Sequence, residues 1–185
     1  WLSHLEVVTS SPPNQAPLSI AGGAYVGLPG IYLGFNENLS WAGAAAGWDQ
    51  TDVYAEKLSN DGNSVLYEEK NVPIKRVPEV VKVAGGNSVR FDVLVVPHHG
   101  PIIPNIVNHQ VIAPDPAVGA LSVRWASATA KNDLEALSAL WTANTTAEAT
   151  KASEMLESGV VRFCFADKTG QVAQTASGRL PVRDP

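Results

Sequence analysis

The sequence predicts an α+β protein that is mainly antiparallel β-sheet, with a pair of helices near its C-terminal end. Over residues 1–126, short apolar runs are separated by Gly and Pro, and no helix-length periodicity appears in the first half. Residues 132–157 carry apolar side chains at helical spacing, and residues 158–185 return to a β-hairpin pattern. With 185 residues, the chain is long enough for one sizeable core, so we expect a single β-rich unit over residues 1–185.

Two turn signals organise the strand-rich part. The Asn-Asp-Gly-Asn run at 60–63 predicts a hairpin between strands at 53–58 and 65–67. Ala-Gly-Gly-Asn at 84–87 predicts a second hairpin, because glycine supplies the positive φ of a tight connection. Its arms are expected at residues 78–83 and 88–96. Further strands are expected at 2–9, 31–35 and 120–125.

The C-terminal part predicts two helices and a closing hairpin. Asn132 or Asp133 can cap a helix whose apolar residues include Leu137 and Leu140. Thr145 and Glu148 have the spacing of a capping box, for a helix that continues to about residue 157. Strands at 160–166 and 171–175 then flank a turn at 167–170.

Composition excludes several classes of protein. A formal charge of −5 with no basic block argues against nucleic-acid binding, and no transmembrane segment is visible. The single cysteine, Cys164, excludes an internal disulfide, and its apolar surroundings predict a core position. The chain begins with Trp1 and ends on a turn-like segment, so we expect that it is cut at both ends.

Three histidines raise the question of a metal cluster. His98 and His99 are adjacent, and neighbouring side chains on a strand point to opposite faces of the sheet. No carboxylate is spaced to complete a ligand set with them and His109. We therefore expect a structural turn at His99, Gly100 and Pro101, and no metal there.

The most distinctive segment is Leu-Pro-Gly-Ile-Tyr-Leu-Gly-Phe-Asn at 28–36, followed by Ser40 and Trp41. It resembles the penicillin acylase family of N-terminal nucleophile hydrolases. The downstream residues that match the family in order are Asp49, Asp52, Tyr54, Glu56, Leu58, His99, Gly100, Pro101, Arg124, Trp125, Ala166, Asp167, Gly170, Gly178 and Pro181. The resemblance spans nearly the whole chain.

The resemblance implies an internal piece of an acylase β chain with part of the αββα N-terminal nucleophile hydrolase fold. The parent would be a hydrolase that is made as a precursor (a zymogen) and cleaves itself. It would then hydrolyse the N-acyl amide bond of β-lactam antibiotics or acyl-homoserine lactones. The family's nucleophile is an N-terminal Ser outside this chain, so the isolated chain should be inactive. Expected partners are the α chain, the rest of the β chain and a small-molecule amide, in the periplasm or outside the cell.

Seven positions carry roles that the resemblance implies. Ala45 would supply a backbone N–H to the oxyanion hole, and Tyr32 and Leu33 would line the acyl pocket. A structural Ca²⁺ would take the carboxylates of Asp49 and Asp52 and the carbonyls of Thr51 and Pro181, and no organic cofactor is expected. The residues themselves leave alternatives open: the run 44–46 as strand packing, Tyr32 and Leu33 as core, and the two aspartates as a solvated turn.

A different class of function fits the chain as it stands. A β-rich module derived from the acylase scaffold, with a binding or structural role and no catalysis, would also lack the nucleophile. Both alternatives remain open on the sequence alone.

Overall fold

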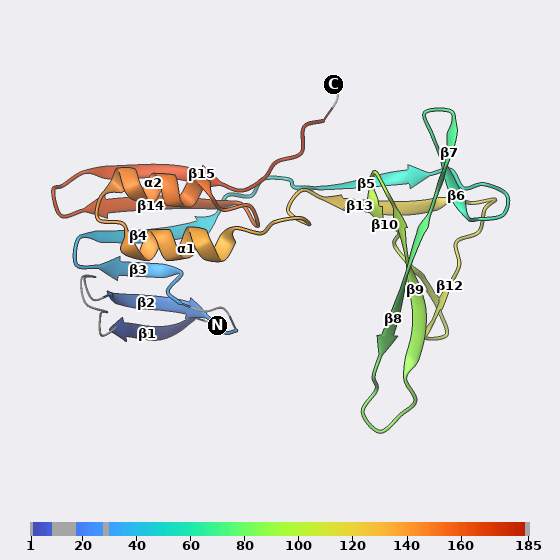
Figure 1. The fold of residues 1–185 in the computed structure, drawn as a ribbon, viewed down its shortest axis with the longest axis horizontal. Coiled ribbons are helices and arrows are strands. Elements are labelled where there is room, and N and C mark those ends of the chain that lie inside the picture. Colours follow the sequence, from blue (N-terminus) through green and yellow to red (C-terminus); the bar gives the residue numbers. More distant parts are fainter. Residues whose placement is uncertain (1, 9–17, 28–29, 184–185) are drawn as a thin grey trace. The chain divides into compact units, whose positions relative to one another are not determined.

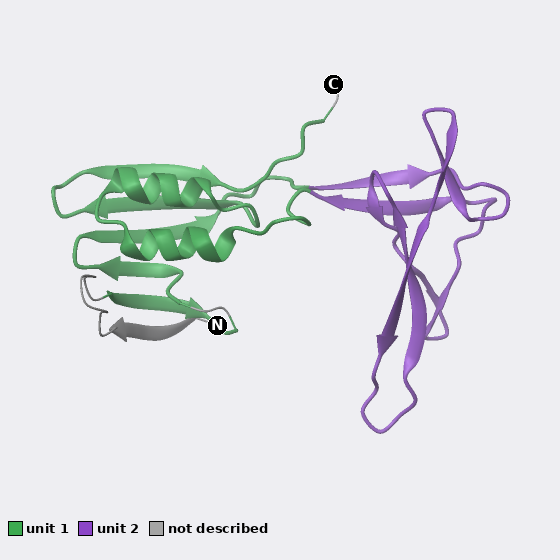
Figure 2. Ribbon diagram, viewed as in Figure 1, with its two compact units in different colours: residues 1–50, 126–185 green, residues 51–125 purple. Residues whose placement is uncertain are grey.

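The computed structural model describes residues 2–8, 18–27 and 30–183, and for residues 2–8 it describes the backbone alone. Leu28 and Pro29 of the distinctive segment lie outside these ranges. Contacts within the chain divide it into two compact units, residues 1–50 with 126–185 (unit 1) and residues 51–125 (unit 2), as Figure 2 shows. The sequence predicts a single β-rich unit over residues 1–185. Each compact unit has its own hydrophobic cluster, and alternation along a strand does not reveal which cluster its apolar face joins.

Unit 1 is a six-stranded antiparallel sheet with two helices packed on one face (Figure 1). The strand order is β1-β2-β3-β4-β14-β15, so the C-terminal hairpin pairs directly with β4. The bounds are β1 Leu2–Val8, β2 Ser19–Tyr25, β3 Leu33–Asn36, β4 Leu39–Ala45, β14 Val161–Asp167, β15 Val172–Ser177, α1 Asp133–Thr142 and α2 Thr146–Glu154. The predicted fold class, with helices near the C-terminal end, is confirmed.

The core of unit 1 lies between these helices and the sheet. Trp41 on β4 and Phe163 and Phe165 on β14 are buried there with Leu140 of α1. Side chains alternate along a strand, so Cys164 is on the opposite face, where it is exposed. The prediction that Cys164 packs in the core is wrong, because the apolar run around it buries alternate residues.

Asn36, from the Gly-x-Asn part of the distinctive segment, joins the β3–β4 turn to the end of α1. Its Nδ2 donates to the carbonyls of Trp141 and Ala143, at 3.0 and 2.8 Å. Its Oδ1 accepts from the backbone N–H groups of Asn38 and Leu39, at 2.9 and 2.8 Å. One side chain therefore satisfies carbonyls that the end of the helix leaves unpaired and also shapes a turn.

The capping box predicted for α2 is present with one change. The hydroxyl of Thr145 accepts from the N–H of Glu148, at 3.2 Å, as predicted. The Glu148 carboxylate accepts from the N–H of Asn144 at 2.7 Å, whereas a standard box would return to the cap residue itself. Asp167 adds a second acceptor, which takes the N–H of Thr146 at 3.1 Å.

The start of α1 and the end of α2 differ from the sequence prediction. Asn132 is the N-cap residue but makes no side-chain cap bond. The Asp133 carboxylate instead accepts the N–H groups of Glu157 and Ser158, at 2.8 and 3.1 Å. The second helix ends at Glu154, three residues before the predicted end.

Unit 2 consists of short antiparallel pieces. Their bounds are β5 Thr51–Glu56, β6 Ser64–Tyr67, β7 Lys70–Pro73, β8 Lys75–Val81, β9 Val89–Val96, β10 Gly100–Pro101, β11 Asn105–Val107, β12 Gln110–Ile112 and β13 Ala120–Trp125. The pairings are β5 with β13, β6 with β7, β11 with β12, and β8-β9-β10. The hairpin turn predicted at 84–87 is confirmed, with Val81 opposite Val89.

The other predicted hairpin is wrong in its main pairing. Residues 53–58 and 65–67 share one isolated bridge, Leu58 to Val65, across the turn at 60–63. The full partner of β5 is β13, which lies much further along the chain. The turn residues at 60–63 predict where the chain reverses. Packing decides which strand pairs with β5 along its whole length.

None of the helices in the described ranges has both the length and the apolar character needed to cross a membrane.

Candidate functional site

Ala45 ends β4 with its side chain exposed. The neighbouring Ala46 N–H donates to the carbonyl of Val160 at 2.9 Å. Hydrogen-bonded positions alternate along an antiparallel pair, so the N–H of Ala45 points away from β14. On that other side, the pairing recorded between β3 and β4 covers Trp41 and Ser40. The amide of Ala45 therefore points away from β14 and lies past the recorded β3–β4 pairs, where a backbone donor can meet a ligand.

Tyr32 and Leu33 lie at the start of β3. Tyr32 packs against the unit 1 core, with its ring centroid 6.1 Å from that of Phe163 and 5.0 Å from that of Tyr25. Burial raises the pKa of Tyr32, which keeps the phenol neutral. Leu33 is half-buried and pairs with Gly23 on β2. A role for the two side chains in an acyl pocket stays a prediction.

The four predicted calcium ligands are divided between the units. In unit 1, the exposed Asp49 pairs with Arg183, with Oδ2 to Nη2 at 2.9 Å, and Pro181 lies two residues before that arginine. In unit 2, Thr51 and Asp52 begin β5, and Asp52 stands opposite Arg124 on β13. Each aspartate thus has a cationic residue paired with it or opposite it within its own unit. The oxygen donors suit Ca²⁺, and the ligand set stays a prediction.

Two hollows lie elsewhere, and Tyr32 and Leu33 line neither of them. A cavity of about 480 Å³ in unit 2 has an apolar wall from β9, the 101–104 segment and the residues after β12. A second cavity, of about 570 Å³, is lined by residues of β4, β14 and β15 on the sheet face that exposes Cys164.

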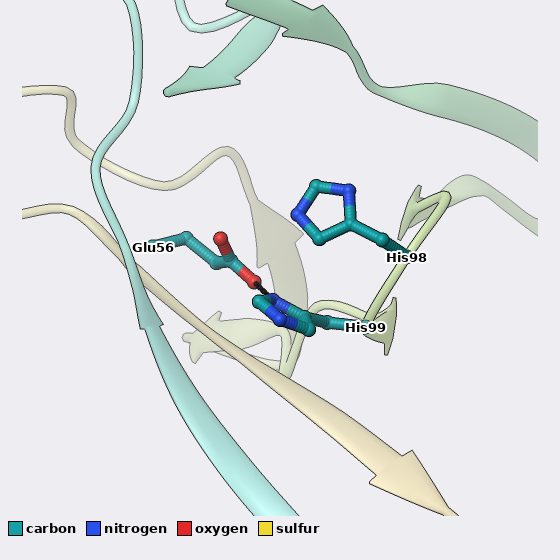
Figure 3. Close-up of side chains that lie close together, drawn as sticks. All are labelled: Glu56, His98 and His99. Atoms are coloured by element: carbon teal, nitrogen blue, oxygen red, sulfur yellow. Dashed lines mark hydrogen bonds and ion pairs between the residues drawn. The ribbon is translucent and has the colours of Figure 1, made fainter. Parts of the chain in front are cut away.

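Three titratable side chains of unit 2 converge in a group that was not predicted from the sequence. Glu56 ends β5, and His98 and His99 lie in the turn between β9 and β10. One ligand-type atom from each lies within 4.8 Å of the other two. Figure 3 shows both imidazoles beside the Glu56 carboxylate. We call Glu56, His98 and His99 the Glu-His-His cluster.

Glu56 is the buried centre of the cluster, with 6% of its surface exposed. Its Oε1 is 2.7 Å from Nδ1 of His99 and accepts the hydroxyl of Ser122 at 2.5 Å. A carboxylate accepts, so Nδ1 of His99 carries the proton and Nε2 of a neutral ring has the lone pair. These two hydrogen bonds join β5 to β13 and to the β9–β10 turn. They offset the cost of burying the Glu56 carboxylate.

The two histidines are held by aromatic rings. Tyr54 stacks on His99 with centroids 3.7 Å apart and planes 6° from parallel, and Tyr67 stacks on His98 at 3.8 Å. Burial, followed by the nearby His99, lowers the pKa of His98 and favours its neutral form. Its Nε2 is buried without a hydrogen-bond partner among the described residues.

This arrangement does not form a Ser-His-carboxylate relay. The hydroxyl of Ser122 donates to Glu56 and not to an imidazole, so the Ser-to-His contact of such a relay is missing. Ser122 is also fully buried, which keeps a substrate away from it. The chemistry that remains to the cluster is binding through imidazole nitrogen and carboxylate oxygen.

Sequence reasoning missed the cluster because it placed the histidines on a strand. In a turn, adjacent side chains can point the same way, and the two rings lie 4.3 Å apart. Glu56 is 42 and 43 residues away in sequence, so its approach depends on the packing of β5 beside the turn. The turn predicted at 99–101 lies two residues earlier, at 97–99, because Gly100 and Pro101 pair with β9 as β10. His109 is not part of the cluster.

The amino-acid sequence of the chain matches a known protein family and several of its members. The family model described as Penicillin amidase matches residues 1–185. The acyl-homoserine lactone acylase QuiP of Pseudomonas aeruginosa is 27% identical over 179 residues, which are 94% of this chain and 20% of that protein. QuiP of Pseudomonas fluorescens strain Pf-5 is 25% identical over 98% of this chain and 22% of its own length. The chain therefore spans about a fifth of these relatives.

A solved structure supports the same fold. A thermostable penicillin G acylase from Alcaligenes faecalis superposes with a TM-score of 0.77 over 95% of this chain and 30% of that chain, at 16% identity. That identity bears on fold alone, and the fold is that of an N-terminal nucleophile hydrolase. With the family match running from the first residue to the last, the chain belongs to the penicillin amidase family.

Proposed function

We propose that this chain is an internal part of an amidohydrolase that removes the acyl group from an N-acyl amide. The observation that carries the proposal is the family match over residues 1–185, together with relatives named as acylases along nearly the whole chain. The orientation of the Ala45 amide also supports it, since a donor that points away from the β14 ladder at a strand end suits an oxyanion.

Acyl-homoserine lactones are our first substrate class, because the two relatives reported above are named as acylases of these compounds. The N-acyl side chains of β-lactam antibiotics are the second class. In both, an apolar acyl group is joined through an amide to a polar amine. Tyr32 and Leu33 are proposed to contact the acyl group, and their half-buried apolar surface at the start of β3 suits that contact.

The nucleophile belongs to sequence outside this chain. An N-terminal Ser, freed by self-cleavage of a precursor, would attack the amide carbonyl while its α-amino group takes the hydroxyl proton. The amine leaves with that proton, and water then hydrolyses the acyl ester. The contribution of this chain is the Ala45 N–H, which would donate to the oxygen that becomes negative in both steps.

Ala45→Pro in the whole protein tests this role, because it removes the N–H and leaves the β4–β14 hydrogen bonds of the neighbouring residues in place. We expect kcat to fall about 100- to 1000-fold while KM changes little. Ala45→Gly keeps the donor and should retain activity. A folded Ala45→Pro protein, checked by circular dichroism, with unchanged kcat would exclude the role.

We also propose a structural Ca²⁺ held by the carboxylates of Asp49 and Asp52 and the carbonyls of Thr51 and Pro181. Calcium takes six to eight oxygen ligands, so the rest of the protein would supply others. The ion pair of Asp49 with Arg183 would compete with the ion. Titration calorimetry of the whole protein should show binding heat that disappears in the Asp49→Ala, Asp52→Ala double variant; unchanged heat would refute the site.

The partners and location follow from the same proposal. The α chain and the remainder of the β chain would complete the enzyme, in the periplasm or outside the cell. Cell fractionation of the source organism tests the location, and recovery of the protein from the cytoplasm alone would contradict it.

A further inference from the structure

We propose that the Glu-His-His cluster binds a divalent transition metal of the Zn²⁺ type. This inference does not depend on the acylase function, because the cluster lies wholly within unit 2 and involves none of Ala45, Tyr32, Leu33, Asp49, Thr51, Asp52 or Pro181.

The convergence of three ligand atoms is the first support. Glu56 comes from the end of β5, whereas His98 and His99 come from a turn more than forty residues later. Their atoms lie within 4.8 Å of one another, and in Figure 3 a ring nitrogen of His98 faces the carboxylate. Ligands of one tetrahedral Zn²⁺ lie roughly 3.4 Å apart, given bonds of about 2.0–2.1 Å. The most distant pair needs to close by roughly 1 to 1.5 Å at most.

The donor types decide the class of metal. Two imidazole nitrogens and one carboxylate suit Zn²⁺, and also Cu²⁺, Ni²⁺ or Fe²⁺, whereas Ca²⁺ and Mg²⁺ prefer oxygen throughout. Three protein ligands leave a position for water or another group.

An unpaired buried atom is the second support. Nε2 of His98 is buried and has no hydrogen-bond partner among the residues that the structure describes. Leaving such a group unpaired is costly, and buried polar atoms without partners are rare enough to need an explanation. A metal held between His98 and Glu56 would give this nitrogen a bond.

The surroundings of the cluster hold its members in place. Ser122 donates to the carboxylate of Glu56, while Tyr54 and Tyr67 stack on the two imidazoles. Metal ligands are usually oriented by such outer partners. The Glu56–His99 contact of 2.7 Å is shorter than the spacing of two metal ligands, so this hydrogen bond would open as the ion enters. The proton on Nδ1 of His99 would then move to Nε2 through solvent, which leaves the Nδ1 lone pair for the metal.

A measurement on the unaltered chain tests the proposal first. The probe is ZnCl₂, added to the ¹⁵N-labelled chain while the histidine ring signals are followed by NMR. We expect one equivalent of Zn²⁺ to shift the rings of His98 and His99 and to leave that of His109 unchanged, while CaCl₂ moves none of them. Equal shifts at His98, His99 and His109, or no shift at His98 and His99, would overturn the proposal.

Variants then identify the ligands. His98→Asn and Glu56→Gln should each weaken Zn²⁺ binding at least about tenfold by calorimetry. The matched control is His109→Asn, which makes the same substitution at an exposed histidine outside the cluster and should leave affinity unchanged. Affinity unchanged in both cluster variants would refute the site, and so would an equal loss in the control. If either variant fails to fold, the NMR titration of the unaltered chain decides alone.

Discussion

At the scale of single residues, much of the family-like pattern has a structural purpose. Gly100, in the His-Gly-Pro match, has φ +112°, and a Cβ built there would lie 2.3 Å from the carbonyl oxygen of Val123. Gly30 has φ +85°, and its Cβ would lie 1.9 Å from the ring of Trp141. Both positions require glycine because of conformation and close approach together.

Gly100→Ala should lower the free energy of unfolding by about 3 kcal/mol, because a backbone atom cannot move away easily. Gly85→Ala is the matched control, with φ +74° and open space around the new Cβ. It should cost only the conformational strain, about 1 kcal/mol. Urea denaturation of both variants provides the measurement, and equal losses would show that the contact with Val123 is unimportant.

Residue roles were predictable where a short pattern decides them. The positive φ at Gly85 was expected from its turn. The turn predicted at 99–101 lies at 97–99 instead. The exposure of Cys164 was not predictable. In an uninterrupted apolar run, the sequence does not show which alternate side chains face the helices and which face away. The approach of Glu56 to His98 likewise depends on tertiary packing.

At the scale of elements, the start of α2 shows how side chains fix a boundary. Asp167 accepts the N–H of Thr146 and both the hydroxyl and the N–H of Thr169. These hydrogen bonds lower the pKa of Asp167 to about 2 from the usual 3.8. The hydrogen bond from the Thr169 hydroxyl makes the largest contribution. One carboxylate thus holds together the β14–β15 turn and the helix start.

The pH dependence follows from this shift. Because the folded pKa is below the unfolded one, the contribution of Asp167 to stability is complete above about pH 4 and lost as the pH falls toward 2. Asp167→Asn should therefore destabilise unit 1 at pH 7, with a difference from the unaltered protein that shrinks between about pH 4 and pH 2. A difference independent of pH would contradict the assignment.

Thr169→Val tests how much the Thr169 hydroxyl contributes to the low pKa of Asp167. Without the hydroxyl donor, the carboxyl of Asp167 should titrate closer to 3.8 when followed by ¹³C NMR, while the N–H of Thr146 still contributes. A carboxyl that already titrates near 3.8 in the unaltered protein would show that these bonds are weak.

Elements were predictable to the extent that their signals are local. The helix pair, the strand at Ala120–Trp125 and the hairpin turn at 84–87 follow from periodicity and turn residues. The pairing of β5 with β13 was missed, because a distant partner leaves no mark on the segment between residues 53 and 67. Long-range pairing is set by burial, which a single sequence shows only as alternation.

At the scale of the whole molecule, two hydrophobic clusters explain two compact units. The cluster of unit 1 joins β4 and β14 to the helices, and that of unit 2 centres on Val65 and Val96. The family was predictable because its matches occur in order along the chain, and the profile over residues 1–185 confirms it. The chain spans about a fifth of relatives such as QuiP.

We propose that this chain supplies part of an acylase active site whose nucleophile lies elsewhere. The most direct test measures release of homoserine lactone from N-acyl-homoserine lactones, by mass spectrometry, for the whole protein and for the 185-residue chain. N-acyl β-lactams serve as the second substrate class. We predict turnover of at least one class by the whole protein and none by the chain alone. Turnover by the chain alone, or no turnover of either class by the whole protein, would contradict the account.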